Sequence, residues 1–440
     1  MEIYGWGKFP TVAAELFAPI DRTALQEFIA EEQNRPIICR GAGRSYGDSS
    51  LAETIVSSRF LDSFAEFNSA DAIVDCGAGV TLGDILKLAI PKGLFLPVLP
   101  GTKTVSVGGA IAADIHGKNH HIDGCFSNFV ISFNLLLASG EVIQCSQVKN
   151  TELFRATCGG MGLTGVILSA RIQLEKVSSV TINQRSLVAS DLDSCLDILD
   201  AHNESKYSVA WVDCLASKQS LGRSIVYLGE HGDDDNLQVR IRRSLSVPFS
   251  TPSFLLNKYT MKAFNSSYFA IKGKNVDSRP VAYDSYFFPL DIIRNWNRLY
   301  GAKGFLQYQF VVPTEAGKAG LREVLTEVNS AGKGSFLAVL KRFGCANENL
   351  LSFPIEGYTL ALDFKYEQNL MPLLSKLDKI VLAYNGRIYL AKDARMDSAT
   401  FKASYPKWEA FCELKRKIDP KSRFCSLQSN RLGITAETTQ

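Results

Sequence analysis

The sequence predicts an α+β fold in two domains, and three observations carry this prediction. At 440 residues the chain is longer than one compact core usually holds. Its first third alternates segments of helical and strand-like periodicity around glycine-rich turns. After about residue 177 the strands become longer and more aromatic, which predicts an antiparallel sheet with helices on one face. We therefore expect a first domain over 1–177, a second over 178–386, and a C-terminal segment over 387–440 that returns to the first domain.

The elements of the first domain follow from their periodicity. In DRTALQEFIAEEQ, Leu25, Phe28 and Ile29 recur at helical spacing, and RPIICRG then predicts a strand. The stretch AIVDCGAGVTLGDILKLAIPKG repeats the order strand, tight turn and helix, with Thr81 as the N-cap. FVISFNLLLASGEVIQCS predicts a β-hairpin that turns at residues 139–140. TELFRATCGGMGLTGVILSARIQLEKV predicts a short helix, a glycine loop and a long strand.

In the second domain, YSVAWVDCL, GFLQYQFVVP and GYTLALDFKY are the clearest strands. One segment stands apart: Phe254–Asn275 is rich in aromatic residues, has no acidic residue, and carries Lys258, Lys262, Lys272 and Lys274. We favour an ordinary surface helix and loop there. The alternative is a mobile, basic and apolar flap that meets a lipid or a membrane surface.

The composition is that of a globular protein. Apolar residues make up 46% of the chain and charged residues 21%, and the net charge of +3 is spread along it, so a nucleic-acid partner is not expected. The start MEIYGWGKFP is not a signal peptide, and no run of eighteen apolar residues predicts a membrane span. The ten cysteines form no CxxC pair, which favours buried free thiols in a reducing, cytoplasmic compartment.

The first glycine loop, ICRGAGRSYGDSS, raises the question of which phosphates it holds. Gly41, Gly43 and Gly47 give GxGxxxG, one residue longer than the Rossmann fingerprint GxGxxG. The following stretch is polar and then strand-like, with no helix to direct its dipole at a pyrophosphate. A Walker loop would end in GK[ST], which is absent. A nicotinamide dehydrogenase and a nucleoside triphosphatase are therefore disfavoured.

Two further loops narrow the answer. PVLPGTKTVSVGGAIAADIHGKNHH contains a Gly108–Gly109 pair among small residues, and GGMGLTGVI is a third glycine loop. Small residues let backbone N–H groups approach a ligand closely, and three such loops suit an extended dinucleotide. The cluster His116, His120 and His121 lacks the further ligands of a zinc site, so no metal is expected, and His120 and His121 are interpreted as packing residues.

These loops resemble the FAD-binding domain of the vanillyl-alcohol-oxidase (PCMH-type) superfamily. Within it, nearly the whole chain resembles the decaprenylphosphoryl-ribose oxidase family, most specifically through DIHGKNHH and LAKDAR and also through GWGKFP, GFLQYQFVVP, LAVLKRFG and LSFPIEGYTLALDF. The resemblance implies a two-domain PCMH-type fold, in which 1–177 is the FAD-binding domain and 178–386 an antiparallel-sheet substrate domain. Because flavin in this superfamily is sometimes attached to a histidine of the first loop, and GAGRSYGD has none, we expect non-covalent FAD.

The function implied by the resemblance is oxidation of the 2′-hydroxyl of a polyprenyl-phosphate-linked ribose to the 2′-keto sugar. This is the first half of an epimerisation to the arabinose form for cell-wall arabinan synthesis, and a separate NAD(P)H-dependent short-chain reductase completes it. Peripheral membrane contact and a periplasmic location are further implications. One alternative keeps FAD but oxidises a free sugar alcohol or aldonolactone. Another is a binding protein that retains the fold without catalysis, in which Lys392 and His116 would be dispensable.

The resemblance also assigns residues. The FAD-binding set is Cys39, Arg40, Gly41, Ala42, Gly43, Arg44, Ser45, Tyr46, Gly47, Asp48 and Ser49 in the first loop, Gly101, Ser106, Val107, Gly108, Gly109, Ala113, Asp114, Ile115 and His116 in the second, and Ile167 and Tyr389. The substrate-binding set is Lys118, Trp211, Gln307, Gln309, Lys341 and Lys392.

Three residues are candidates for catalysis, namely Lys392, His116 and Tyr46. A cation beside the flavin stabilises the negative charge that develops there, and the resemblance assigns this role to Lys392. A surface lysine paired with Asp393 is the competing interpretation, and RIYLA before it argues against full exposure. Any of the three candidates could take the hydroxyl proton.

The substrate residues carry physical arguments of their own. Gln307 and Gln309 alternate along one strand and share a face, as paired contacts to a sugar require, and Lys341 suits a phosphate. Trp211 is interpreted equally as a sugar or polyprenyl contact and as a core residue. Two positions depart from the family: a reactive cysteine of its best-known members falls at Ala361, and an asparagine at Thr359. Covalent inhibition through that thiol is therefore not expected.

Overall fold

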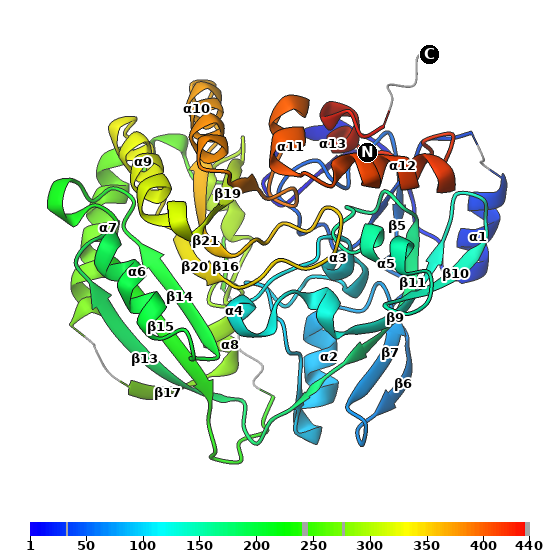
Figure 1. Ribbon diagram of the computed structural model, residues 1–440, viewed down its shortest axis with the longest axis horizontal. Helices are drawn as coiled ribbons and strands as arrows, with labels where there is room; N and C mark the ends of the chain where they lie inside the picture. The colour runs from blue at the N-terminus through cyan, green and yellow to red at the C-terminus, as the bar shows by residue number, and fades with distance from the viewer. Residues whose placement is uncertain (32–33, 240–244, 275–277, 436–440) are drawn as a thin grey trace.

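The computed structural model describes residues 1–31, 34–239, 245–274 and 278–435. Two groups of sheets lie side by side in Figure 1, one built mainly by the first 177 residues and one by the middle of the chain. The predicted α+β fold of PCMH type is confirmed. Within the described part of the chain, no helix is long and apolar enough to cross a membrane.

The first group contains two main sheets. A parallel sheet has the order β3 (Glu15–Phe17), β5 (Thr54–Ser57), β4 (Ile38–Arg40). An antiparallel sheet has the order β10 (Val142–Ser146), β9 (Val130–Leu136), β11 (Val166–Gln173), β7 (Ile73–Gly77), β6 (Phe64–Asn68). Small pairs are formed by β1 (Glu2–Tyr4) with β2 (Thr11–Ala13) and by β8 (Leu94–Phe95) with β12 (Glu175–Lys176). The helices here are α1 (Arg22–Glu31), α2 (Leu82–Ala89), α3 (Val107–Ala112), α4 (His120–Asp123) and α5 (Thr151–Thr157).

Local chemistry explains these elements. The Thr81 side chain accepts from the Asp84 N–H and begins α2 as predicted, and Leu82, Ile85, Leu86 and Ala89 bury one face of that helix. The hairpin β9–β10 pairs Val142 with Leu136, so the turn falls where the sequence predicts it. All ten cysteines are free thiols, and eight of them are buried.

The second group is one antiparallel sheet of eight strands. Its order is β17 (Ser278–Ala282), β13 (Thr181–Ala189), β15 (Ser224–His231), β14 (Tyr207–Val212), β20 (Ala338–Phe343), β21 (Gly357–Lys365), β19 (Phe305–Pro313), β22 (Arg387–Ile388). The small parallel pair β16 (Leu245–Ser246) and β18 (Ile293–Arg294) lies outside it.

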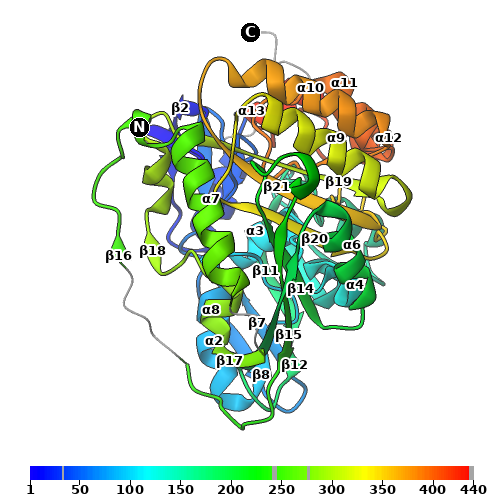
Figure 2. The same cartoon turned by 90° about the vertical axis from the view of Figure 1, so that its left-hand side faces the viewer.

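Helices cover both faces of this sheet, so the prediction of helices on one face is wrong. The helices α6 (Leu192–Ala201), α9 (Gly317–Ser330) and α10 (Leu370–Ala383) pack on one side. On the other side lie α7 (Lys258–Gly273) and α8 (Tyr283–Phe287), as Figure 2 shows. The sequence missed this because that face is only partly covered, and its strands carry polar residues where a cavity opens.

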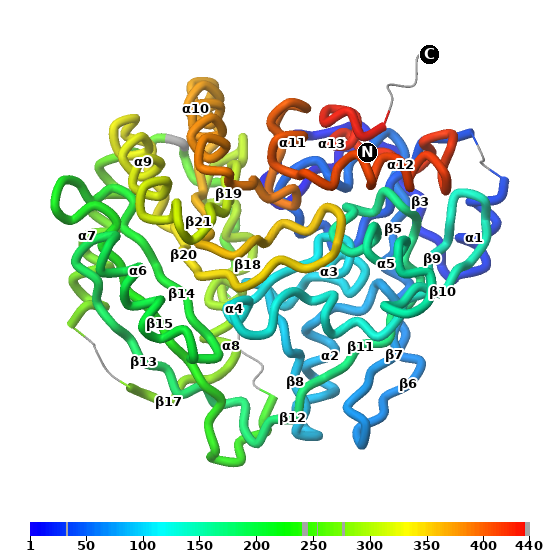
Figure 3. The backbone as a smooth tube through the Cα atoms, in the orientation of Figure 1, coloured from blue at the N-terminus to red at the C-terminus, as the bar shows by residue number. Residues whose placement is uncertain are grey.

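The C-terminal segment joins the two groups. Its strand β22 extends the eight-stranded sheet beside β19, and the chain then crosses to α11 (Ser398–Ser404), α12 (Trp408–Ile418) and α13 (Leu427–Leu432) over the first group, as the tube in Figure 3 follows. There Ile37 bridges Phe424, and the Lys415 ammonium donates to the Leu163 carbonyl. This path carries Lys392 across the boundary between the groups.

Candidate active site

A cavity of about 1490 Å³ lies between the glycine loops of the first group and the inner face of the eight-stranded sheet. Pockets for single drug-sized ligands are roughly 300–1,000 Å³, so this one has room for a dinucleotide together with a substrate headgroup. Helices α7 and α8 and residues 289–299 complete its walls.

Most of the predicted site residues line this cavity. They are Gly41, Ala42, Gly43, Arg44, Ser45, Tyr46, Ser49, Gly101, Ser106, Gly109, Ala113, Ile115, His116, Lys118, Trp211, Gln307, Gln309, Lys341, Tyr389 and Lys392. Those that do not line it are Cys39, Arg40, Gly47, Asp48, Val107, Gly108, Asp114 and Ile167.

Two of the residues outside the cavity wall, Asp114 and Gly47, support it from behind. The buried Asp114 carboxylate accepts hydrogen bonds from Ser352, Asn347 and Asn349, which ties the second glycine loop to the segment after β20. Gly47 passes so close to the C-terminal segment that an added Cβ would lie 1.7 Å from the Asp393 carbonyl oxygen. The loop therefore needs glycine at this position for packing.

The first two glycine loops meet at Ser106. Its hydroxyl accepts from the Ala42 N–H at 3.3 Å and from the Gly109 N–H at 3.4 Å, and an added Cβ on Gly41 would lie 2.2 Å from that oxygen. Gly101, by contrast, faces open space. The Arg44 guanidinium lies 4.6 Å above the Trp6 ring, and its buried Nε has no partner among the described residues. Open glycine backbone and an unpartnered guanidinium nitrogen fit an FAD diphosphate at this end of the cavity.

The sheet forms the opposite wall, and its register sets the order of side chains. Trp211, Val339, Ala361 and Gln309 are paired neighbours across β14, β20, β21 and β19, so they form one row on the cavity face. On the same face Lys341 is paired with Thr359, and Gln307 is paired with Asp363. The Trp211 indole N–H donates to the Phe336 carbonyl, so this residue is at once buried and part of the wall.

Gln309 and His116 connect the two walls. The Gln309 amide Nε2 lies 3.1 Å from His116 Nε2 and donates to the Thr359 hydroxyl at 3.2 Å. Because an amide nitrogen only donates, His116 Nε2 accepts, and the proton of the neutral ring sits on Nδ1. Nδ1 is buried and has no partner among the described residues. Burial, together with the charge of Lys341, holds the pKa of His116 well below its ordinary value, so the ring is neutral.

Gln307 leads to a residue that the sequence did not single out. Its amide donates to Asp363, which is fully buried and also accepts from the Tyr300 hydroxyl at 3.2 Å. Burial raises the pKa of Asp363 to about 7. The sequence TLALDF contained a signal for this residue. Asp363 follows Ala361 by two positions in a strand, and this period puts both on the cavity face.

Lys392 stands above the first loop. Its ammonium lies 3.7 Å from the centre of the Tyr46 ring and has no hydrogen-bond acceptor among the described residues. Burial lowers the pKa of Lys392 to about 7, and the Asp363 carboxylate opposes this shift. For Tyr46, burial raises the pKa well above its ordinary value, so the phenol keeps its proton. A surface lysine paired with Asp393 is ruled out, because Asp393 pairs with Arg431 instead.

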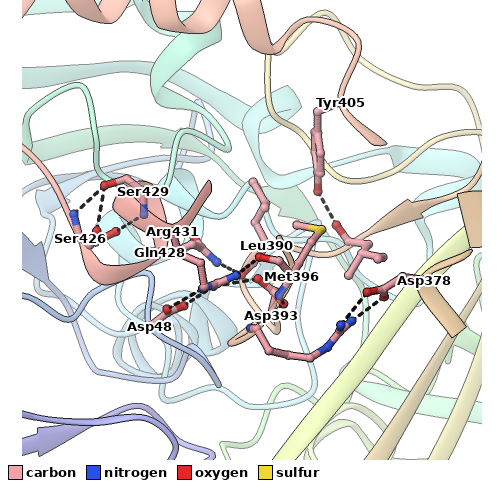
Figure 4. A network of polar contacts seen from close by, with 12 residues as sticks. Asp48, Asp378, Leu390, Asp393, Met396, Tyr405, Ser426, Gln428, Ser429 and Arg431 are labelled. Atoms are coloured by element: carbon pink, nitrogen blue, oxygen red, sulfur yellow. Dashed lines mark hydrogen bonds and ion pairs between the residues drawn. The ribbon is translucent and has the colours of Figure 1, made fainter. Parts of the chain in front are cut away.

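A polar network holds the segment that carries Lys392 (Figure 4). Arg431 pairs with Asp48 at 2.8 Å and with Asp393 at 2.9 Å, and so joins the first glycine loop to this segment. Asp393 also accepts from the backbone N–H groups of Arg395 and Met396. With the Tyr46 N–H donating to the Ala391 carbonyl at 3.0 Å, the Lys392 backbone is fixed on both sides.

Two further lysines contribute positive charge to the cavity. The Lys118 ammonium donates to the Tyr286 carbonyl and lies 4.2 Å from the Tyr286 ring centre, while Lys341 lies 5.9 Å from the Phe343 ring centre. Burial lowers the pKa of Lys118 to about 7 and that of Lys341 to about 8. Within the described residues, no cluster of three or more histidine, cysteine or acidic side chains is arranged to hold a metal ion.

Comparisons with known proteins agree with this geometry. Residues 16–146 match the FAD binding domain family, and residues 303–432 match the D-arabinono-1,4-lactone oxidase family. Over 98% of its length the chain is 36% identical to the decaprenylphosphoryl-β-D-ribose oxidase of Mycolicibacterium smegmatis, of which it covers 97%. It is 33% identical over 81% of its length to an uncharacterised protein of Streptomyces coelicolor, of which it covers 100%. It is 22% identical to the L-gulonolactone oxidase of Mus musculus over 96% of each chain.

The fold, the cavity and these matches define an oxidoreductase that binds FAD and acts on a CH–OH group. Within this class, the chain belongs to the decaprenylphosphoryl-β-D-ribose oxidase family. The sequence-based prediction of the superfamily, the FAD cofactor and the reaction class is confirmed.

Proposed function

We propose that the protein oxidises the 2′-hydroxyl of a polyprenyl-phosphate-linked ribose to the 2′-keto sugar. The observation that carries this proposal is the full-length likeness to a relative named for decaprenylphosphoryl-β-D-ribose. Gln307, Gln309 and Lys392 converge on the cavity between the glycine loops and the sheet wall. Bound FAD supplies the two-electron acceptor for the hydrogen that leaves carbon.

Lys392 is our choice for the proton acceptor. The His116 Nε2 lone pair already accepts from Gln309, and Tyr46 keeps its proton, so neither of the other candidates is free to take one. Lys392 has a pKa of about 7 and no acceptor bound to it, so a neutral amine is available near neutral pH. Once protonated, the ammonium stays in the cavity and stabilises negative charge there.

Basic and apolar residues of the cavity suit the phosphate and the lipid of the substrate. Lys341 and Lys118 line the cavity as basic side chains, and Trp211, Leu256 and Met261 supply apolar surface. We propose that the two lysines bind the substrate phosphate. The product keto sugar needs a reductant to reach the arabinose form, and a separate NAD(P)H-dependent reductase is our proposal for that partner.

The surface around α7 supports contact with an anionic bilayer. The segment 254–274 forms a short turn and then α7, which lies along the outside of the molecule in Figure 2. The Phe254 side chain is 72% exposed and that of Tyr259 73%, and Asn275 lies outside the described residues. The stretch 245–274 carries four lysines and no acidic residue. Leu255 and Phe264 are exposed and also line the cavity, so the apolar surface is continuous with its mouth. A bilayer docked there would deliver a lipid-linked sugar directly.

A free aldonolactone is the second candidate substrate, favoured by the match of residues 303–432 to the D-arabinono-1,4-lactone oxidase family. Comparing turnover of polyprenylphosphoryl-ribose with that of aldonolactones decides between the two. We expect oxidation of the lipid-linked sugar and a drop in its kcat/KM of about tenfold or more in Lys341→Met. Preferential turnover of a lactone, unchanged by Lys341→Met, would overturn the proposal.

Two measurements test the remaining parts. The visible spectrum after acid precipitation should place the FAD in the supernatant, because we propose non-covalent binding; colour in the pellet would contradict it. The protein should sediment with phosphatidylglycerol vesicles more than with phosphatidylcholine vesicles, and Phe254→Ser with Tyr259→Ser should abolish this. Val148→Ser, at a side chain 94% exposed in the first group, is the matched control. Wild-type protein left in the supernatant, or self-association through the same residues, would argue against a bilayer.

A further inference from the structure

The two glutamines on the cavity wall are each held in one orientation by the acceptors behind them. For Gln309 the decisive neighbour is Thr359, whose hydroxyl donates to the Phe310 carbonyl at 2.8 Å. That hydroxyl oxygen therefore accepts from Gln309, and the amide must turn its nitrogen toward it. Thr359 and Gln309 are 1% and 4% exposed, so a mispaired carbonyl there would be a buried repulsive contact.

For Gln307 the decisive neighbour is Asp363. Above a pH of about 7 the Asp363 carboxylate is ionised and only accepts, so the amide of Gln307 presents its nitrogen to it. The other carboxylate oxygen is already occupied by the Tyr300 hydroxyl. Each glutamine therefore uses its nitrogen on the support behind it and keeps its carbonyl oxygen for the cavity.

We infer that Asp363 is a positioning residue that fixes Gln307 so that, together with Gln309, it presents two carbonyl oxygens as acceptors for two hydroxyl groups of the substrate. This inference rests on the proposed function and adds to it the feature of the substrate that is selected. Positions i and i+2 of a strand lie about 7 Å apart, a span that neighbouring hydroxyls on one sugar ring reach with the two side chains turned inward. A substrate lacking one hydroxyl leaves an acceptor unpaired and is disfavoured.

Two variants of Asp363 separate this role from a merely structural one. In Asp363→Asn the amide oxygen still accepts from Gln307, while its nitrogen donates to the Tyr300 oxygen, so the orientation of Gln307 is kept. In Asp363→Ala the support is gone and Gln307 is free to turn. We expect Asp363→Ala to raise KM for the ribosyl substrate about three- to tenfold with little change in kcat, and Asp363→Asn to restore a KM near the wild-type value.

The 3-deoxy analogue of the ribosyl lipid supplies the second readout. In the wild type and in Asp363→Asn, loss of this hydroxyl should lower kcat/KM about tenfold, whereas Asp363→Ala and Gln307→Leu should discriminate much less. Titration of the holoenzyme with ribose 5-phosphate and its 3-deoxy form, followed by the change in the visible FAD spectrum, gives the same comparison without turnover.

The outcomes are distinct. If the wild type does not oxidise the ribosyl lipid, the proposed function fails, and the titration still reports on the glutamine pair. If the wild type is active and discriminates but Asp363→Ala does so equally well, with the same KM, Asp363 does not position Gln307. If both Asp363 variants lose activity together with FAD, the test rests on Gln307→Leu alone. If Gln307→Leu discriminates against the 3-deoxy analogue as strongly as the wild type does, the inference is overturned.

Discussion

The two sides of the cavity are built on different principles. On the glycine-loop side, the surface is mostly backbone and small residues, joined by the single hydroxyl of Ser106, and the buried Arg44 Nε is left without a partner. On the sheet side, side chains from four strands interlock, and each amide nitrogen on the wall is already bound. The loop side therefore fits an anionic, extended cofactor, and we propose that the sheet side recognises individual hydroxyl groups of a substrate.

Substitutions on the two sides of the cavity should therefore have different effects. A substitution on the loop side acts sterically, because an added Cβ or side chain fills room that the cofactor needs. A change on the sheet side acts through hydrogen-bond direction or charge and should leave the FAD in place.

The largest effect is expected from Gly41→Val. An added Cβ there meets the Ser106 oxygen at 2.2 Å and separates the first two glycine loops, so we expect FAD content to fall below about a tenth of the wild-type value. Gly273→Ala is the control, since Gly273 does not line the cavity and its new methyl group would make only ordinary van der Waals contacts. The absorbance ratio of flavin to protein measures both. Equal FAD content in the two variants would remove the steric basis of the comparison.

Lys392→Met should lower kcat about a thousandfold while keeping FAD bound, because the proton acceptor is lost from a preserved cavity. Lys392→Arg tests the role more narrowly: its guanidinium keeps the charge but cannot take a proton. We expect both variants to be similarly slow in stopped-flow measurements of flavin reduction. An active arginine variant would assign Lys392 the role of a cation only.

Arg431→Met should destabilise the fold without touching either wall directly. It leaves Asp48 and Asp393 buried at 3% and 5% exposure with their shared cation removed, so we expect a loss of about 3–5 kcal/mol in the free energy of unfolding. Denaturant titration measures this change. Lys318→Met, which removes an exposed ion pair with Asp197, is the control and should change stability by less than about 1 kcal/mol.

The smallest effect is a shift in pH dependence. If neutral Lys392 takes the proton, kcat/KM should fall as the pH drops through about 7, where the amine becomes protonated. The Asp363 charge raises the pKa of Lys392, so Asp363→Asn should lower it and move this limb to more acidic pH. The ratio of kcat/KM at pH 6 to kcat/KM at pH 8 should then be higher in Asp363→Asn than in the wild type, by a factor of a few. A limb that moves toward alkaline pH would contradict the assignment.

Elements that depend on short-range signals could be predicted from the sequence. The glycine loops, the Thr81 N-cap and the hairpin at residues 139–140 depend on neighbours only a few positions apart, and the motifs around His116 and Lys392 sufficed to indicate the cofactor and the reaction class. These features depend on residue types with strong local preferences, such as glycine in tight turns and threonine at a helix N-cap.

Tertiary structure alone decided which side chains meet. The hydrogen bond from Gln307 to Asp363 joins residues 56 positions apart, and that from the Tyr389 hydroxyl to the Ala113 carbonyl joins residues 276 positions apart. Strand register, which no single segment encodes, placed Asp363 beside Gln307. Hydrogen bonds from Ser352, Asn347 and Asn349, all distant in the sequence, hold Asp114 behind the cavity wall. Polarity and pKa follow from burial and partners, so the choice among Lys392, His116 and Tyr46 could be made only once their surroundings were known.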